Sequence, residues 1–205
     1  MQAAHALIEL SRTQPKAPAQ KVSDETLIRS IAAGDERAVE MLYARYNVRV
    51  YRFILRLTRR VHLAEDLVSE VFFDVWRQAA KFEGKSQVST WLLAIARYKA
   101  VAALRCRSDE YLDDDAVAAI ADPSDDPETM AHNKGRNAIV RNCLARLSPV
   151  HREVIDLVYY HEKSVDEVAR IVGVPASTVK TRMFYARSQI ARLLKDAKFD
   201  RACAC

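Results

Sequence analysis

Residues 62–82, HLAEDLVSEVFFDVWRQAAKF, carry the clearest pattern of apolar and polar positions in the chain. Apolar side chains recur at the spacing of one α-helical stripe, at Ala64, Leu67, Val68, Val71, Phe72 and Val75. The positions outside the stripe include Asp66, Glu70, Phe73, Asp74 and Arg77. A phenylalanine among charged residues is unusual on a surface that contacts only water. This face of the helix is therefore a candidate binding surface.

Two helices are predicted before this one. Ser23 or Asp24 can cap a helix that Gly34 ends, and Asp35 can cap a second helix that runs on through Leu55.

A polar loop, EGKSQVST, separates residue 82 from a basic helix, WLLAIARYKAVAALRCR, that Ser89 or Thr90 can cap. Cations and aromatic rings alternate along this helix, at Trp91, Arg97, Tyr98, Lys99, Arg105 and Arg107. Rings can take unstacked bases while cations follow phosphates, so the helix suits single-stranded nucleic acid. Core aromatic residues beside solvated cations are the simpler interpretation, and on this helix alone it is favoured. Trp76 and Trp91 are both compatible with core positions.

The last third of the chain predicts four more helices, over residues 137–147, 149–163, 164–173 and about 175–194. Ser148 followed by Pro149 has the form of a helix start, and Ser164 with Glu167 forms a capping box. Gly173 ends the third of these helices, directly before the fourth.

The final two helices have the spacing of a helix-turn-helix, with Ala169, Gly173 and Val179 at the positions where the helices approach and turn. An inner apolar stripe on the last helix leaves a polar face that points away from it, at Ser177, Thr178, Thr181, Tyr185 and Ser188, with Lys180, Arg182 and Arg187 beside it. Hydroxyls and cations at a helix start suit base edges and phosphates in a major groove. A plain helical hairpin with a solvated face is the alternative, and the basic flank favours DNA.

The net charge of +5 is unevenly distributed over the 205 residues. Residues 108–133 hold nine acids and no Lys or Arg, so that segment carries −9 and the rest of the chain +14. This charge distribution is compatible with a protein that binds polyanions through its basic helices. It is equally compatible with ordinary basic helices beside a solvated acidic linker. Few glycines and the absence of β-branched runs favour an all-α chain. The expected organisation is a disordered lead (1–22), a helical domain (23–107), an acidic flexible linker (108–136), a second helical domain (137–196) and a tail (197–205).

Several function classes find no support. The sequence has no phosphate loop, HExxH or nucleophile elbow, so no catalytic residue, metal site or cofactor is predicted. The cysteines lack the spacing of zinc ligands. We interpret Cys203 and Cys205 as part of a frayed tail rather than as a metal or redox site. Neither a signal peptide nor an apolar run of about 20 residues is present, so a cytoplasmic protein without membrane insertion is expected.

Three segments in this order resemble the bacterial group IV, or extracytoplasmic-function (ECF), sigma factors of the sigma-70 family: AEDLVSEVFFDVW, STWLLAIARYKAVAALR and residues 144–194. The resemblance covers roughly residues 24–107 and 137–195. It implies two helical domains, sigma domain 2 and a helix-turn-helix domain 4, and no enzymatic activity. Two departures stand out: Ser69 where a Gln is frequent, and Tyr98-Lys99 where an Asn often follows the Arg.

The resemblance also implies partners and residue roles. The partners are core RNA polymerase, through its β′ clamp helices and β flap, promoter DNA, and an anti-sigma factor. The polymerase-binding residues are then Asp66, Glu70, Phe73, Asp74 and Arg77. The −10 element is opened and held by Lys85, Ser86, Trp91, Arg97, Tyr98, Lys99 and Arg105, and the −35 element is read by Ser177, Thr178, Lys180, Thr181, Arg182 and Tyr185. A stand-alone helix-turn-helix regulator is the alternative, and a helical adaptor without DNA contact is a weaker one.

Overall fold

The computed structural model describes residues 22–106 and 142–203, with side chains from 22 to 105 and from 142 to 196. Its elements are α2 (Asp24–Ala32), α3 (Glu36–Thr58), α4 (Val61–Gln78), the 3-10 turn η1 (Ala79–Lys81), α5 (Val88–Cys106), α8 (Pro149–Tyr159), α9 (Val165–Val172) and α10 (Ala176–Cys203). No strand occurs among these residues, which confirms the all-α fold. The predicted lead, acidic linker, helix start at residue 137 and the side chains of Cys106, Cys203 and Cys205 lie outside the described residues.

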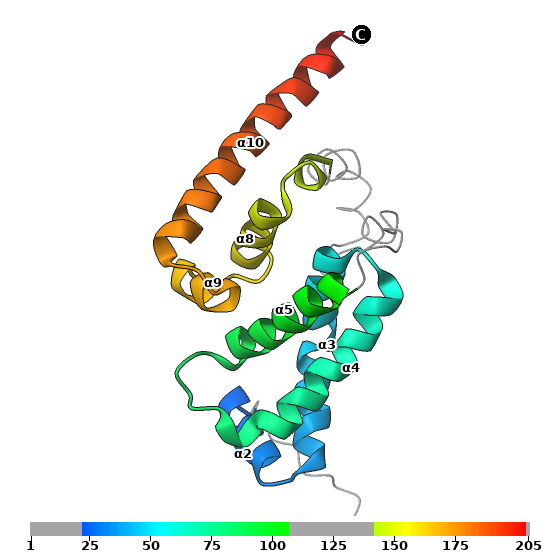
Figure 1. The fold of residues 1–205 in the computed structure, drawn as a ribbon, viewed down its shortest axis with the longest axis vertical. Helices are drawn as coiled ribbons and strands as arrows, with labels where there is room; N and C mark the ends of the chain where they lie inside the picture. The colour runs from blue at the N-terminus through cyan, green and yellow to red at the C-terminus, as the bar shows by residue number, and fades with distance from the viewer. Residues whose placement is uncertain (1–21, 107–141, 204–205) are drawn as a thin grey trace, which may run out of the picture.

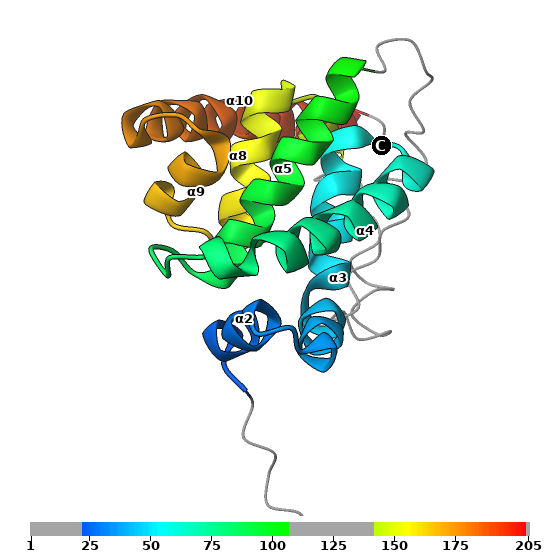
Figure 2. The same cartoon turned by 60° about the horizontal axis from the view of Figure 1, so that its bottom comes forward.

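The helices form two units (Figure 1). The first unit packs α3, α4 and α5 against one another, with α2 across their end. The second unit packs α8, α9 and the long α10. Turned by 60°, the structure shows the second unit beside the first, with α9 packed against α5 and α8 in contact with α3 (Figure 2).

Local sequence explains most helix ends. Ser23 and Asp35 cap α2 and α3 with side-chain oxygens that accept backbone N–H groups. Ser148 precedes Pro149 at the start of α8, and Ser164 and Glu167 form the complete capping box of α9. These predicted starts are confirmed. The side chains of Ser23, Asp35 and Ser164 satisfy amides that have no partner inside the helix, whereas Ser148 makes no such hydrogen bond and Pro149 has no N–H to satisfy.

Two predicted boundaries are wrong. Helix α5 begins at Val88, so Ser89 and Thr90 lie in its first turn rather than at its cap. Both side chains are buried, because α9 of the second unit packs over this turn. Helix α10 continues to Cys203, well beyond the predicted end near Leu194.

The predicted apolar stripe of α4 is buried along its whole length, and Phe53, Leu92 and Leu93 complete the same core. This core does not stop at the edge of the first unit. Val154 and Leu157 of α8 and Val168 of α9 belong to the same continuous cluster. The two units therefore share one apolar core in this structure, which sequence patterns did not predict.

Candidate nucleic-acid and protein interfaces

The outer face of α4 exposes two aromatic rings. The side chain of Phe73 is 59% exposed and that of Trp76 is 47% exposed, one helical turn apart. Charged residues surround them: Asp66, Glu70 and Arg77 are exposed, and the guanidinium carbon of Arg77 lies 5.8 Å from the centre of the Phe73 ring. An apolar centre with a charged rim is the usual anatomy of a protein-binding surface.

Trp76 was missed at the sequence level, where a core position was considered for it. That interpretation is wrong for Trp76, because its ring lies on the same side of α4 as Phe73. The signal was available, since Trp76 follows Phe73 by three residues and falls outside the apolar stripe. We call Asp66, Glu70, Phe73, Asp74, Trp76 and Arg77 the α4 face.

Lys99 of α5 connects to this face. Its ammonium lies 3.0 Å from the Glu70 carboxylate and 2.9 Å from that of Asp74. Burial by itself lowers the pKa of Lys99, but the hydrogen bonds and charges of Asp74 and Glu70 outweigh burial and raise it overall. A cation predicted to follow DNA is thus held by two carboxylates predicted to bind polymerase, and it stays charged.

The other residues predicted for the −10 element divide into two groups. Tyr98 is 74% exposed and Arg105, two turns later, is exposed as well. Trp91 is partly buried, with its ring centre 5.1 Å from that of Phe82. Arg97 donates to Glu153 of α8 at 2.6 Å, so it is not free for phosphate in this structure.

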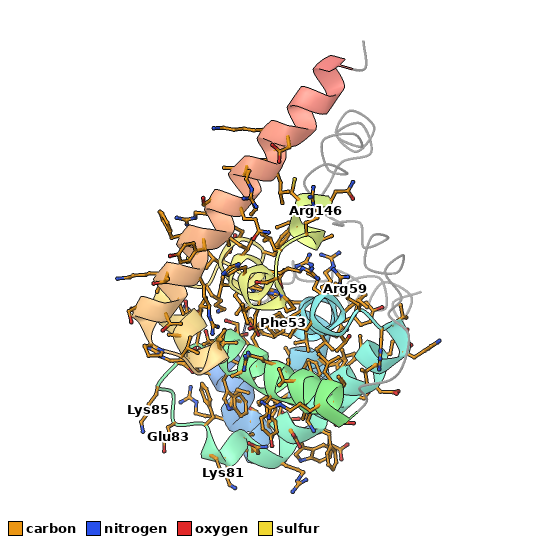
Figure 3. All side chains as sticks on the ribbon, turned by 45° about the horizontal axis from the view of Figure 1, so that its top comes forward. Phe53, Arg59, Lys81, Glu83, Lys85 and Arg146 are labelled. Carbon is orange, nitrogen blue, oxygen red and sulfur yellow. The ribbon has the colours of Figure 1, made fainter. Side chains whose placement is uncertain are left out.

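The loop before α5 projects from the body of the molecule. Figure 3 shows Glu83 and Lys85 at its outer edge and Lys81 on the preceding turn η1, all pointing away from the helices. Lys85 pairs with Glu83, while Ser86 is partly buried. The loop also contacts the second unit, because the Arg170 guanidinium of α9 donates to the Lys85 carbonyl at 3.3 Å.

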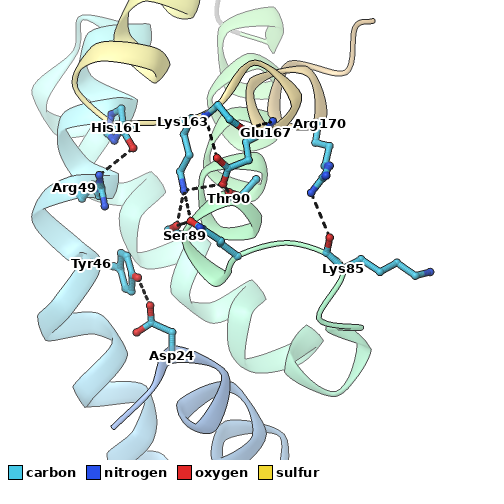
Figure 4. A network of polar contacts seen from close by, with 12 residues as sticks. Asp24, Tyr46, Arg49, Lys85, Ser89, Thr90, His161, Lys163, Glu167 and Arg170 are labelled. Atoms are coloured by element: carbon cyan, nitrogen blue, oxygen red, sulfur yellow. Dashed lines mark hydrogen bonds and ion pairs between the residues drawn. The ribbon is translucent and has the colours of Figure 1, made fainter. Parts of the chain in front are cut away.

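A polar network joins the first turn of α5 to α9 (Figure 4). The Lys163 ammonium donates to the Ser89 hydroxyl at 2.6 Å and to the Glu167 carboxylate at 3.3 Å, and the Thr90 hydroxyl donates to Glu167 at 2.5 Å. Burial lowers the pKa of Lys163, despite its neighbour Glu167. Burial alone would raise the pKa of Glu167, but hydrogen bonds from Thr90 and Ser164 and the charge of Lys163 bring it down to about 2.

The second unit contains the predicted helix-turn-helix. Gly173 adopts φ 71°, a left-handed conformation that glycine tolerates best, and its N–H donates to the Ala169 carbonyl at 2.8 Å. Val179 is fully buried against α9, and Met183 and Ala186 continue the inner stripe. This arrangement presents the start of α10 to solvent.

The predicted reading residues lie on the outer side of α10. Ser177, Lys180, Thr181 and Tyr185 are exposed, and Thr178 and Arg182 are partly exposed. Phe184 lies among them with 68% of its surface exposed and was missed by sequence reasoning. Its spacing was the available signal, because it follows Thr181 by three positions and Ser177 by seven.

Within the described ranges, no helix has the length and apolarity of a membrane span. In the same part of the chain, no three His, Cys, Asp or Glu side chains gather as metal ligands would.

Comparison with protein families gives two matches. The model of sigma-70 region 2 matches residues 42–110, and that of sigma-70 region 4 matches residues 137–190. The ECF RNA polymerase sigma factor SigK of Mycobacterium tuberculosis is 31% identical over 162 residues, which are 78% of this chain and 87% of SigK. SigW of Bacillus subtilis, another ECF sigma factor, is 28% identical over 179 residues, covering 82% of this chain and 95% of SigW.

Solved structures give the same fold. The sigma factor RpoE of Bartonella quintana, in complex with the anti-sigma factor NepR, aligns with a TM-score of 0.59 and 25% identity over 76% of this chain and 96% of that one. CnrH, in complex with the cytosolic domain of CnrY, aligns with a TM-score of 0.61 and 22% identity over 85% of this chain and 99% of that one.

Proposed function

The chain belongs to the ECF RNA polymerase sigma factors of the sigma-70 family, and we propose a specific role for each of its three exposed surfaces. As a member of this family, it binds core RNA polymerase and directs promoter recognition at the start of transcription. The stand-alone regulator and the adaptor lose their support, because both sigma regions are matched in order.

The α4 face is the proposed docking site for the β′ clamp helices of core polymerase. The observation that carries this proposal is the exposed pair Phe73 and Trp76 inside a charged rim. Desolvated aromatic side chains supply much of the binding energy at protein interfaces. Asp66, Glu70 and Arg77 then set the orientation of the complex through charge.

The loop before α5 and the exposed side of α5 are proposed to open and hold the −10 element. Tyr98 is placed to stack on an extruded base, and Arg105 and Lys85 are exposed cations for phosphates. Trp91 supports the loop through Phe82 rather than offering a free ring. Capture of unpaired bases offsets the few kcal/mol that unstacking costs, so opening needs no catalytic group.

The outer side of α10 is proposed to read the −35 element. Ser177, Thr181 and Lys180 lie on its first two turns, where side chains of a recognition helix reach base edges and phosphates. Tyr185 and the neighbouring Phe184 add apolar contact area further along.

An anti-sigma factor is proposed as a further partner, and the β flap of polymerase as the contact of the second unit. Support for the anti-sigma factor comes from RpoE, a structural neighbour that was solved with NepR. We also propose that the chain acts without enzymatic activity and in the cytoplasm, where polymerase and promoters are found.

The test is a fluorescence-anisotropy titration of labelled chain with purified core RNA polymerase. Phe73→Ala/Trp76→Ala should weaken binding at least a hundredfold, because two central rings are lost. Met41→Ala/Val48→Ala is the matched control, since it removes two exposed apolar side chains from α3 and should bind like the parent. Binding of the α4 variant at parental affinity would place the docking surface elsewhere. The Glu70→Lys substitution is less clean, because it sets a second cation beside Lys99.

A further inference from the structure

Two acidic side chains of the α4 face share a single cation. The Lys99 ammonium lies 3.0 Å from the Glu70 carboxylate and 2.9 Å from the Asp74 carboxylate. Glu70 and Asp74 are four positions apart on α4, where like charges repel each other across one helical turn. A cation between them replaces this repulsion by two attractive contacts, so Lys99 favours one arrangement of both carboxylates.

The cation comes from a different helix than the two acids. Lys99 belongs to α5, which packs against α4, and its side chain is only 17% exposed. Burial by itself lowers the pKa of Lys99, but the hydrogen bonds and charges of Asp74 and Glu70 raise it overall. The ammonium therefore stays charged at neutral pH, in a fixed place between two helices of the first unit.

The two carboxylates differ in how far they are open to a partner. The side chain of Asp74 is 19% exposed, whereas that of Glu70 is 57% exposed. Glu70 also lies one helical turn before Phe73, whose exposed ring is central to the α4 face. A carboxylate has about four acceptor positions, so an ion pair with Lys99 leaves Glu70 able to accept further hydrogen bonds. Asp74 is thus placed as an anchor for the ammonium, and Glu70 as the group that a partner can reach.

The direction of the Glu70 side chain affects how readily a partner can bind it. An exposed glutamate on a helix samples several rotamers, and a partner that needs one of them loses free energy when the others are frozen out. An ion pair formed before binding removes part of that loss, since the side chain already occupies the required direction. Lys99 can do this because Asp74 fixes the ammonium from the more buried side.

We infer that Lys99 is a positioning residue of the polymerase-docking site, which anchors on Asp74 and holds the Glu70 carboxylate in place beside Phe73. The inference rests on the proposed function of the α4 face. It reassigns Lys99 from the −10 surface, where the sequence pattern placed it, to the binding of core polymerase. Lys99 acts through Glu70 rather than by touching polymerase itself.

Substitution of Lys99 tests this role through the affinity for core RNA polymerase, measured by fluorescence anisotropy with the labelled full chain. Lys99→Met keeps an unbranched apolar stem without the charge, and it should weaken binding about tenfold, the scale of one hydrogen bond to a charged group. Lys99→Arg keeps a cation that can bridge two carboxylates, and it should stay within about twofold of the parent. Arg37→Met is the control, because it removes an exposed cation from α3 and should leave the affinity unchanged.

A combination with Glu70→Gln separates positioning from a general structural effect. If Lys99 acts through Glu70, Lys99→Met should weaken binding by no more than about twofold in a chain that already carries Glu70→Gln. A residue that only supports the packing of α4 against α5 would instead lower the affinity by the same factor in both chains. Unchanged helical circular dichroism and a cooperative melt show that each variant is folded. Lys99→Gln, which keeps a donor without the charge, replaces Lys99→Met if that variant unfolds, and it should lose affinity in the same direction.

The order of the Glu70 side chain gives a readout that needs no polymerase. Carbon-13 relaxation should show a Glu70 side chain more ordered than that of Glu40, an exposed glutamate of α3, and Lys99→Met should abolish the difference. Equal mobility of Glu70 and Glu40 in the parent, parental or higher affinity of Lys99→Met, or an additive effect with Glu70→Gln would overturn the inference. If the parent fails to bind polymerase, the proposed function fails instead, and the relaxation data still decide whether Lys99 holds Glu70.

Discussion

Protonation of Glu167 offers a quantitative test of the network between α5 and α9. Its pKa is lowered from 4.5 to about 2 by hydrogen bonds from Thr90 and Ser164 and by the charge of Lys163, which outweigh its burial. One pKa unit corresponds to about 1.4 kcal/mol, so this shift corresponds to about 3 kcal/mol of folding free energy at most. Solvent screening around a partly accessible carboxylate reduces the expected value to about 1–2 kcal/mol.

The sign follows from the folded-state pKa, which lies below the unfolded-state value. The ionised carboxylate stabilises the folded chain fully above about pH 4.5, and this contribution is lost as the pH falls through about 2. Glu167→Gln should therefore lower the free energy of unfolding by about 1–2 kcal/mol at pH 7. The difference between the variant and the parent should shrink steadily from pH 5 to pH 3.

Urea denaturation followed by circular dichroism at pH 7, 5, 4 and 3 measures this difference. Asp166→Asn is the control, because Asp166 lies in the same first turn of α9 but is exposed. The control should change stability by about 0.5 kcal/mol or less through the helix dipole. A Glu167→Gln difference that stays constant between pH 7 and pH 3 would refute the account of the network.

Three further predictions concern the core, the turn and the DNA surface. Phe53→Ala should cost about 3–5 kcal/mol of unfolding free energy, measured in urea, since Phe53 is fully buried in the shared core. Gly173→Ala should cost about 1–2 kcal/mol, seen as a lower Tm, because φ 71° strains any residue with a Cβ, although nothing lies within 4 Å of the added atom. Lys180→Glu/Arg182→Glu should weaken binding to duplex DNA and lower the slope of log affinity against log salt by up to about 1.8, measured by anisotropy.

Much of the fold follows from local chemistry. The α4 stripe, the caps at Ser23 and Asp35, the capping box of α9 and the turn at Gly173 are each determined by residues within a few positions of one another. Such signals need no knowledge of the tertiary structure. The start of α5 was predicted wrongly for the opposite reason. Ser89 and Thr90 are good capping residues, but their hydroxyls bond Lys163, in the turn before α9, and Glu167 of α9, which lie 74 and 77 residues away.

The candidate surfaces also combine features that nearby residues determine with features that depend on distant contacts. Patterning predicted most of the exposed residues of α4 and α10, with Trp76 and Phe184 as the exceptions, because exposure on a helix follows from its periodicity. Periodicity does not predict which exposed charge finds a distant partner. Arg97 and Lys99 have the same sequence signature as Arg105, yet they are paired with Glu153 and with Asp74, whereas Arg105 lies exposed.

These ion pairs determine how much each cation of the basic helix α5 can contribute to DNA binding. A cation that is already held by a carboxylate gains less from a phosphate, because the first ion pair must break before the second forms. In this arrangement of the two units, Arg97 can therefore contribute to DNA binding only after Glu153 of α8 has moved away. Lys99 differs, since its carboxylate partners belong to α4 in the same unit and remain beside it whether or not the units separate. Separation of the two units would thus change the charge that α5 offers to DNA at Arg97 and leave it unchanged at Lys99. Removal of the Arg97 charge should consequently weaken DNA binding only when the two units are apart.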